Sequence, residues 1–212
     1  RQQQENSDKL IFVQEEERKR IASDLHDEIG GELALMKLYL QKLQVPEVPE
    51  LLKMLDKTAS ASRQIAHDLM PPDFENTSLP GLLGSQVGNI GKLGKIDIQF
   101  FSSGQYPPLL ANYSLMIYRI YMELISNILR HAMASEATIQ LICEEEMLLL
   151  MAEDNGRGIP KDVQLGLGLN NIRTRIKYLE GNLNIDSHEN GTTIIIQIPV
   201  KPFMLNDKNN YS

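Results

Sequence analysis

Cysteine, tryptophan and long hydrophobic runs are scarce in this sequence, and each scarcity narrows the class of protein. Cys143 is the only cysteine among 212 residues, which excludes an intrachain disulfide and fits a reducing compartment. The longest apolar runs, near residues 147–152 and 194–196, are far shorter than the roughly 18 residues that a membrane-spanning helix needs. Basic residues are outnumbered by acidic ones, with 21 Lys and Arg against 28 Asp and Glu. The resulting net charge of −7 argues against nucleic acid as the main partner, because phosphate backbones recruit basic surfaces.

Apolar residues are present in sufficient number for a packed core, and in the first third of the chain they follow helical spacing. They make up 42% of the sequence, which argues against wholesale disorder. Residues 8–44 are predicted to form one long amphipathic helix and residues 50–69 a second, with Pro46 and Pro49 between them. The first helix carries an apolar stripe: Ile21, Leu25, Ile29, Leu33, Met36, Leu40 and Leu43. A hairpin of this length cannot bury such a stripe alone, so we expect two copies to pair into a four-helix bundle.

The rest of the chain mixes strands and helices. We predict helices at about 79–93, 110–132 and 170–180, the last ending at Gly181, and strands at 96–100, 137–143, 147–152, 182–187 and 192–200, the last two joined by Asn190-Gly191. This pattern predicts an α+β fold with helices on one face of a mixed sheet. The expected domains are a helical hairpin at 1–70, a linker at 71–77, a mixed domain at 78–203 and a frayed tail at 204–212.

His26 is the most distinctive residue of the first helix. A rotation of about 100° per residue places it just off the apolar stripe, beside Leu25 and Ile29. Gly30 lies one turn away. A glycine in a helix costs about 1 kcal/mol relative to alanine, and one use for it here is to clear space around the imidazole. Asp27 follows directly and is able to accept a proton from the ring or to orient it. A solvated surface histidine in a charged helix is the open alternative.

A second polar cluster lies on the predicted helix 110–132. Glu123, Asn127, Arg130 and His131 share one ridge at helical spacing. The amide oxygen of Asn127 suits Mg²⁺, and the side chains of Arg130 and His131 are able to donate hydrogen bonds to phosphate oxygens. A polar helix face without a ligand is the open alternative.

Two glycine-containing segments follow that helix. Asp154 ends an apolar strand, where its carboxylate is placed to accept a hydrogen bond from an amino group on a base. Gly156 and Gly158 allow the backbone to approach a ligand closely, although an ordinary Asn-Gly turn is the open alternative. Residues 166–171 open a helix, whose free N–H groups make an anion site. The order and spacing of both segments after Asn127 favour a nucleotide pocket.

Together these segments resemble the catalytic core of a two-component sensor histidine kinase, of the subfamily whose phosphoacceptor motif is His-Asp-x-x-x-Gln. The resemblance spans roughly residues 8–200. It includes the acceptor box at His26-Asp27, the asparagine box at 123–132, the glycine boxes at 154–158 and 166–169, and Gly191-Thr192 before the last strand. It implies a hairpin that dimerises into a four-helix bundle, followed by the α/β sandwich ATP-binding domain shared by histidine kinases, gyrase-type and Hsp90-type ATPases.

The resemblance implies a role for each matching residue. His26 would be phosphorylated from ATP with Asp27 as the activating base, and the phosphoryl group would then pass to an aspartate of a response regulator. Asn127 would hold Mg²⁺ beside Glu123, and Asp154 would read the adenine amino group. The other positions expected to bind the nucleotide or shape its pocket are Arg130, His131, Gly156, Gly158, Gly166, Gly168, Leu169 and Thr192. A short lid is expected at 159–165.

Gly31 departs from the family pattern. The subfamily has a glutamine five positions after the histidine, where it is thought to position the water that dephosphorylates the partner regulator. Glycine has no side chain to hold that water. We therefore expect kinase activity to be kept and phosphatase activity to be weak or to use another residue.

Other classes of protein fit less well. A catalytically silent, ATP-binding dimeric scaffold is opposed by the intact His26, Asn127 and Asp154. A topoisomerase or chaperone ATPase, or an anti-sigma-type serine kinase, is disfavoured by the hairpin with its His-Asp pair. The chain starts at Arg1 and shows no signal peptide, so we expect a cytoplasmic fragment of a longer sensor, with any membrane segment upstream.

Overall fold

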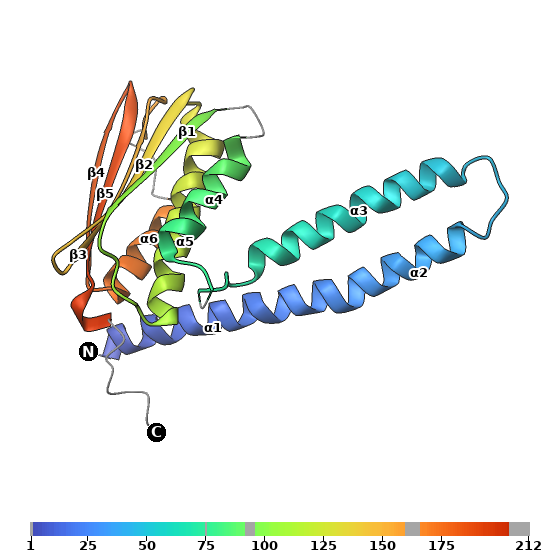
Figure 1. Ribbon diagram of the computed structural model, residues 1–212, viewed down its shortest axis with the longest axis horizontal. Helices are drawn as coiled ribbons and strands as arrows, with labels where there is room; N and C mark the ends of the chain where they lie inside the picture. Colours follow the sequence, from blue (N-terminus) through green and yellow to red (C-terminus); the bar gives the residue numbers. More distant parts are fainter. Residues whose placement is uncertain (1, 75, 92–95, 160–165, 204–212) are drawn as a thin grey trace. The chain divides into compact units, whose positions relative to one another are not determined.

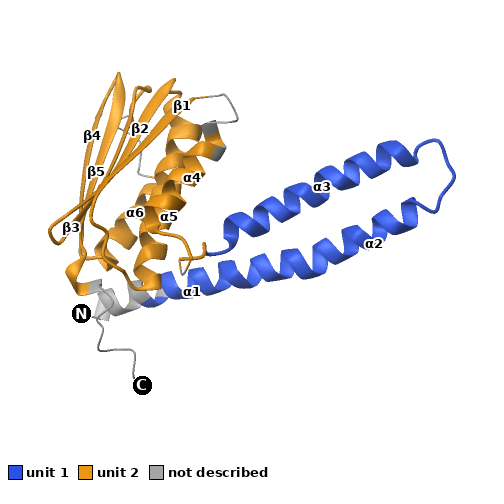
Figure 2. Ribbon diagram, in the orientation of Figure 1, with its two compact units in different colours: residues 1–71 blue, residues 72–212 orange. Residues whose placement is uncertain are grey.

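The chain forms two compact units. The computed structural model describes residues 2–74, 76–91, 96–159 and 166–203. The units are Arg1–Pro71 and Pro72–Ser212 (Figure 2). The last helix of the first unit ends at Leu69, just ahead of Pro71-Pro72. Proline lacks a backbone donor and restricts the residue before it, which explains a helix end at this point.

The first unit is a helical hairpin (Figure 1). Its first arm runs through α1 (Gln2–Asp24), a π-helical turn η1 (Leu25–Ile29) and α2 (Gly30–Leu40), and its second arm is α3 (Val48–Leu69). Three predicted boundaries were wrong, the first being the start of α1, which lies at Gln2 rather than at residue 8. The first arm ends at Leu40 rather than at residue 44, and α3 begins at Val48, so Pro49 lies in its first turn. Proline is tolerated there because the N–H that it lacks has no acceptor within the helix.

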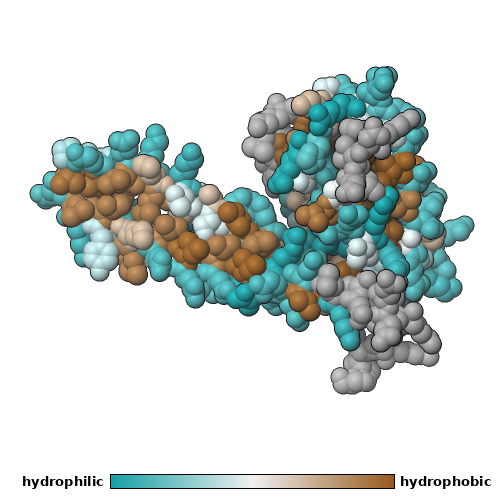
Figure 3. Space-filling model, turned by 180° about the vertical axis from the view of Figure 1, so that it is seen from behind, coloured by the Kyte–Doolittle hydropathy of each residue, from teal (hydrophilic) through white to brown (hydrophobic). Residues whose placement is uncertain are grey.

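The hairpin leaves much of its apolar surface open. Half-buried positions of α3 recur every three or four residues, at Leu52, Leu55, Ala59 and Ser62. Between the arms, Lys37 Nζ lies 2.6 Å from Asp56 Oδ1; this exposed pair contributes at most about 1 kcal/mol. Several large apolar side chains are 43–62% exposed: Ile29, Met36, Leu43, Met54 and Ile65. Apolar surface therefore runs along the hairpin (Figure 3).

The second unit is built on a five-stranded sheet with the strand order β1-β2-β3-β5-β4. The strands are β1 (Asp97–Gly104), β2 (Glu136–Glu144), β3 (Met147–Asp154), β4 (Asn182–His188) and β5 (Gly191–Pro199). β1 pairs in parallel with β2, and the other pairs are antiparallel. The helices α4 (Leu79–Gly91), α5 (Ala111–Asn127) and α6 (Leu167–Tyr178) lie on one face of the sheet (Figure 1). A second π-helical turn, η2 (Ile128–Ala132), extends α5, and a 3-10 turn, η3 (Lys201–Phe203), follows β5. The predicted α+β arrangement is confirmed.

The core lies between the sheet and these helices. Alternate residues of the strands are fully buried, among them Ile139, Leu150 and Ile196, as the two-residue period of a strand requires. Tyr121 of α5 is also fully buried, and its hydroxyl donates a hydrogen bond to the Leu83 carbonyl at 2.6 Å. This packing fixes α5 against the sheet, so the polar residues at its C-terminal end hold a defined place beside the end of β3.

Three predictions for the second unit are corrected. β1 extends to Gly104 rather than to residue 100, because it pairs with β2 along its whole length. α6 begins at Leu167 rather than at residue 170. The left-handed residue after α6 is Glu180, with φ 53°, and not Gly181. Glycine is required at 181 for a different reason: a Cβ there would lie only 2.6 Å from the Gln197 carbonyl oxygen.

Two further expectations concern membrane-spanning helices and the segments predicted as a tail and a lid. Among the described residues, no helix combines the length and apolar character needed to cross a bilayer. The predicted tail at 204–212 and residues 160–165 of the predicted lid lie outside the described residues.

Candidate functional site

A pocket of about 570 Å³ opens in the second unit where α5, η2, the end of β3, the start of β5 and the start of α6 meet. Ten residues predicted from the sequence line it: Glu123, Asn127, Arg130, His131, Asp154, Gly158, Gly166, Gly168, Leu169 and Thr192. Apolar side chains complete the lining, including Leu124, Ile128 and Ile194. This size and mixture are typical of small-ligand sites. A hollow of about 390 Å³ between α6 and β4 holds none of the predicted residues.

Gly156 is predicted to belong to the site, but it lies behind the pocket rather than in its lining. A Cβ at this position would lie 2.2 Å from the Ala132 carbonyl oxygen, so no side chain fits. The neighbouring N–H of Arg157 donates to the same carbonyl at 2.8 Å. Gly156 therefore shapes the pocket indirectly, by allowing the loop after β3 to close on the end of η2.

Asp154 is the half-buried acid of the pocket. Its Oδ1 accepts a hydrogen bond from the Gly156 N–H at 2.9 Å. Burial raises the pKa of Asp154 above its usual range, and hydrogen bonds from the N–H groups of Gly156 and Thr192 oppose that rise. The carboxylate therefore lies at the end of β3 as predicted, in the pocket lining, where it is able to accept a hydrogen bond from a ligand.

Asn127 and Glu123 lie one helical turn apart on α5, facing Gly168 at the start of α6. Asn127 Nδ2 is buried and has no hydrogen-bond partner among the described residues. A Cβ on Gly168 would lie 2.1 Å from Glu123 Oε1 and 3.5 Å from Asn127 Oδ1. An unpartnered buried N–H donor is costly unless a ligand supplies an acceptor such as a phosphate oxygen. Glycine at 168 separately keeps space beside the Glu123 and Asn127 oxygens. The pair thus provides oxygen ligands for a cation.

The start of α6 provides the anion side of the pocket. Gly166 is the residue before the helix, with φ −60° and ψ 170°, and Leu167 is its first residue. The first N–H groups of a helix have no intrahelical acceptors and carry a partial positive charge. Arg130 and His131 line the same pocket from η2. The second glycine box therefore opens a helix, as the sequence predicts, and suits an anionic ligand.

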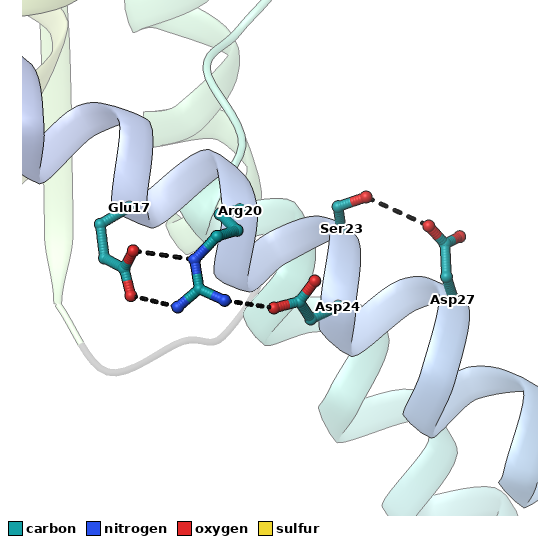
Figure 4. Close-up of polar contacts among 5 residues, drawn as sticks. All are labelled: Glu17, Arg20, Ser23, Asp24 and Asp27. Atoms are coloured by element: carbon teal, nitrogen blue, oxygen red, sulfur yellow. Dashed lines mark hydrogen bonds and ion pairs between the residues drawn. The ribbon is translucent and has the colours of Figure 1, made fainter.

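His26 lies in the first unit, within η1. Its side chain is 66% exposed, and Nδ1 lies 3.0 Å from Asp27 Oδ1. Ser23 donates to the other carboxylate oxygen of Asp27 at 3.1 Å, while Arg20 pairs with Glu17 and Asp24 one turn earlier (Figure 4). Hydrogen bonds from His26 and then Ser23 lower the pKa of Asp27 below its usual range. The carboxylate thus stays ionised and is able to hold the imidazole by one nitrogen.

Comparison with known proteins assigns both units. Residues 17–73 match a family described as histidine kinase, and residues 112–202 match the histidine kinase-, DNA gyrase B-, and HSP90-like ATPases. The chain is the catalytic core of a sensor histidine kinase. The predicted family and fold are therefore confirmed.

Curated relatives of this kinase core are longer than it is. It is 30% identical over 207 residues to the sensor histidine kinase MctS of Rhizobium johnstonii, a match that covers 90% of this chain and 45% of the relative. It is 28% identical to the sensor histidine kinase YvfT of Bacillus subtilis over 87% of this chain and 51% of the relative. For the sensor protein VraS of Staphylococcus haemolyticus the identity is 29%, over 92% and 59%. The core thus spans about half the length of the curated relatives it matches.

Solved structures share the fold of the kinase core. The histidine kinase domain of the blue-light activated histidine kinase EL346 of Erythrobacter litoralis superimposes with a TM-score of 0.55 at 21% identity, over 83% of this chain and 97% of that one. Full-length ShkA, solved in complex with AMPPNP, gives a TM-score of 0.57 at 16% identity, over 90% and 46%.

Gly30 does not serve the purpose expected of it beside His26. A Cβ on Gly30 of the kinase would meet only the Leu25 carbonyl oxygen, at 3.8 Å, and a Cβ on Gly31 would meet nothing within 4 Å. Within one chain, Gly30 is therefore not needed to clear space around His26. Both positions have room for a side chain.

Arg157 is a charged pocket residue that sequence reasoning missed. It lines the pocket of the kinase, and its Nε donates a hydrogen bond to the His131 carbonyl at 2.9 Å. This contact holds the guanidinium against the His131 carbonyl. The signal was its charge at a variable position of the Asp-x-Gly-x-Gly loop, where only the aspartate and the glycines were considered. Asn155 is structural, since its Oδ1 accepts hydrogen bonds from the N–H groups of Ser135 and Glu136.

Proposed function

We propose that this core phosphorylates itself on His26 with ATP and then passes the phosphoryl group to an aspartate of a response regulator. One combination carries the proposal: an exposed imidazole held by a carboxylate, in the same chain as a pocket whose polar groups suit a nucleoside triphosphate. A catalytically silent, ATP-binding scaffold needs the pocket but not the oriented imidazole.

ATP is the proposed phosphoryl donor. The Asp154 carboxylate accepts a hydrogen bond from the adenine amino group. The start of α6, together with Arg130 and His131, binds the phosphates. Support comes from the ATPase family match over residues 112–202 and from the ShkA structure, which contains AMPPNP.

We assign Mg²⁺ to Asn127, with Glu123 beside it. The described residues contain no group of three or more His, Cys, Asp or Glu that could hold a metal. That fits Mg²⁺, which takes few protein ligands and is otherwise held by phosphates and water. The oxygens of Glu123 and Asn127, which both lie beside Gly168, support the assignment. When bound, Mg²⁺ neutralises the negative charge of the phosphates.

His26 acts as the nucleophile and Asp27 as its base. Because the ionised carboxylate lies beside Nδ1, it favours the tautomer that carries its proton there, and the lone pair of Nε2 is left to react. A bond forms between Nε2 and the γ-phosphorus while the bond from that phosphorus to the bridging oxygen breaks. ADP leaves, and Asp27 takes up the Nδ1 proton. The phosphoryl group then transfers to a carboxylate oxygen of the regulator.

The partners follow from the surface of the hairpin. The exposed apolar side chains, such as Ile29, Met36 and Leu43, suit pairing with a second copy into a four-helix bundle. A receiver domain docks beside His26. We place the core in the cytoplasm, where ATP and the regulator are found, attached to the membrane only through segments outside this chain. With glycine at 31, phosphatase activity toward the regulator is weak.

Incubation with Mg²⁺ and ATP labelled at the γ-phosphorus tests the proposal. We expect label on the protein that is lost in acid and retained in base, and that is prevented by chelating the metal. Calorimetry with and without Mg²⁺ measures ATP binding separately from phosphorylation. A protein that binds ATP but acquires no label is the silent scaffold instead.

A further inference from the structure

Ser187 joins two walls of the nucleotide pocket. It lies near the end of β4, and its side-chain oxygen makes two short contacts. The backbone N–H of Ile159 donates to Ser187 Oγ at 2.8 Å, and Ser187 Oγ lies 3.0 Å from Thr192 Oγ1. Ile159 and Thr192 both line the pocket, whereas Ser187 does not. One hydroxyl outside the pocket thus connects two segments that form it.

On the Thr192 side, this connection continues to Asp154, the half-buried acid of the pocket. Thr192 is 7% exposed and is the register partner of Asp154 across β3 and β5. Its backbone N–H donates to the Asp154 carboxylate. The hydroxyl that Ser187 contacts therefore belongs to the residue that also holds Asp154.

The Ile159 side is fixed by close packing as well as by the hydrogen bond. Gly158 has φ +71°, and a Cβ there would lie 2.0 Å from the His188 carbonyl oxygen and 3.1 Å from Ser187 Oγ. The loop at Gly158 and Ile159 thus lies directly on the end of β4. The Ser187 hydroxyl is the side-chain group that fixes the loop at this contact.

The Ile159 N–H fixes Ser187 Oγ as an acceptor at that contact, whereas either hydroxyl is able to donate in the contact between Ser187 and Thr192. In the arrangement where Ser187 donates, Thr192 keeps its hydroxyl proton for a ligand. The pocket presents an acceptor, Asp154, next to a donor, Thr192. That order matches the adenine edge, whose amino group donates and whose ring N1 accepts, and it opposes the guanine edge, whose O6 accepts and whose N1–H donates.

We propose that Ser187 is a positioning residue for nucleotide binding: it holds the Gly158–Ile159 wall in place and orients the Thr192 hydroxyl as a donor, which favours adenine over guanine. This inference rests on the proposed function. It adds base selection by a residue that does not itself touch the nucleotide.

The test compares Ser187→Ala with Ser187→Thr, which keeps the hydroxyl. The control is Ser102→Ala in the edge strand β1, an exposed position whose hydroxyl makes no hydrogen bond among the described residues. Dissociation constants for ATP and GTP are measured by calorimetry, and KM and kcat by autophosphorylation. We expect Ser187→Ala to raise the ATP dissociation constant and KM about five- to tenfold, the effect of losing one hydrogen bond.

The base preference is the readout that a purely structural role would not move. In Ser187→Ala the dissociation constant for GTP should change less than about twofold, so that the preference for ATP over GTP shrinks. The kcat at saturating ATP should stay within about twofold of the wild-type value. Ser187→Thr should restore both affinity and preference, and Ser102→Ala should match wild type. Any of three results overturns the proposal: an unchanged dissociation constant for ATP in Ser187→Ala, an unaltered ratio of the ATP and GTP dissociation constants, or ATP binding by Ser187→Thr that is as weak as that of Ser187→Ala.

Amide hydrogen exchange at Ile159 without nucleotide separates this inference from the proposed function. Exchange should be faster in Ser187→Ala than in wild type. Equal rates would show that the hydrogen bond from the Ile159 N–H to Ser187 does not hold this loop. If wild type binds no ATP, the proposed function fails. The nucleotide role of Ser187 then fails with it, even where faster exchange shows that the contact with Ile159 exists.

Discussion

Two histidines of the hairpin are each followed by an aspartate, and their geometry separates them. His26 Nδ1 lies 3.0 Å from Asp27 Oδ1, whereas His67 Nδ1 lies 3.7 Å from Asp68 Oδ1, beyond hydrogen-bond range. Asp68 Oδ1 instead accepts a hydrogen bond from Gln64 at 2.8 Å. Both imidazoles are exposed, so access does not distinguish them. The two differ in whether the following aspartate orients the imidazole, and this difference favours His26 as the nucleophile.

Asp154→Asn is predicted to weaken ATP binding about ten- to hundredfold. The carboxylate is replaced by an amide that carries no charge, and a hydrogen bond to a charged group contributes about 1.5–3 kcal/mol. Calorimetry on folded protein measures the loss. An unchanged dissociation constant would contradict the assignment of Asp154 to the base.

The same variant is predicted to be slightly more heat-stable at neutral pH. Burial raises the pKa of Asp154, so its ionised form costs the folded state free energy at any pH above that raised pKa. As the pH falls through the raised pKa, the wild-type carboxyl takes up a proton and this cost disappears. The advantage of the variant at pH 7 should therefore shrink on acidification. Thermal unfolding over a pH series checks this, and an advantage that grows toward low pH contradicts it.

Gly168→Ala and Gly166→Ala form a matched pair at the start of α6. A Cβ on Gly168 would lie 2.1 Å from Glu123 Oε1, so that carboxylate must move, whereas a Cβ on Gly166 meets nothing within 4 Å. Glu123 is a flexible side chain, so stability should change little in either variant. Binding of ATP with Mg²⁺ should fall about tenfold in Gly168→Ala and stay near wild type in Gly166→Ala. Equal losses in the two variants would refute the role given to Glu123.

At the scale of elements, the sequence predicted the type of each helix and strand better than its ends. Apolar spacing located both hairpin arms and every strand, because burial of one face imposes that spacing. The π-helical turns η1 and η2 were not predicted, since one additional residue in a turn barely disturbs a hydrophobic pattern. Both turns hold residues assigned to function, His26 in η1 and Arg130 and His131 in η2. Such turns are frequent at functional sites.

Gly31→Gln tests the element that carries His26. A Cβ at 31 meets nothing within 4 Å, so glutamine fits on α2. Replacing glycine within a helix should raise the free energy of unfolding by roughly 0.5 kcal/mol. Phosphatase activity toward the phosphorylated regulator should also increase, because the amide supplies a group to hold water. Gly31→Ala is the control, with the gain in stability but no gain in phosphatase activity. A wild-type protein that already dephosphorylates the regulator as fast as Gly31→Gln does would show that glycine is no impediment.

At the scale of the whole molecule, the exposed stripe of the hairpin is predicted to be the dimer interface. Met36 is 51% exposed on that stripe, and Met36→Glu should raise the dimer dissociation constant at least about 100-fold, because a carboxylate would lose its hydration on pairing. Gln41→Glu adds the same charge away from the stripe and should leave the dimer intact. Sedimentation velocity over a concentration series distinguishes the two. Equal behaviour of both variants places the interface elsewhere.

The sequence also predicted the division into a hairpin and a mixed domain, since Pro71-Pro72 and the change from helical to mixed periodicity are visible without coordinates. The pocket could be predicted only in part. Its motif residues were identified by their chemistry, but Arg157 and Ser187 act through backbone contacts with His131 and Ile159, and such contacts exist only after folding.

The most direct test of the account is the location of the label after reaction with γ-labelled ATP and Mg²⁺ in wild type, His26→Gln and His67→Gln. The second variant is the matched control, because it removes an exposed histidine of the same hairpin that is also followed by an aspartate. The account predicts acid-labile label on wild type and on His67→Gln, and none on His26→Gln. Label that persists on His26→Gln, or that disappears from His67→Gln alone, would contradict it.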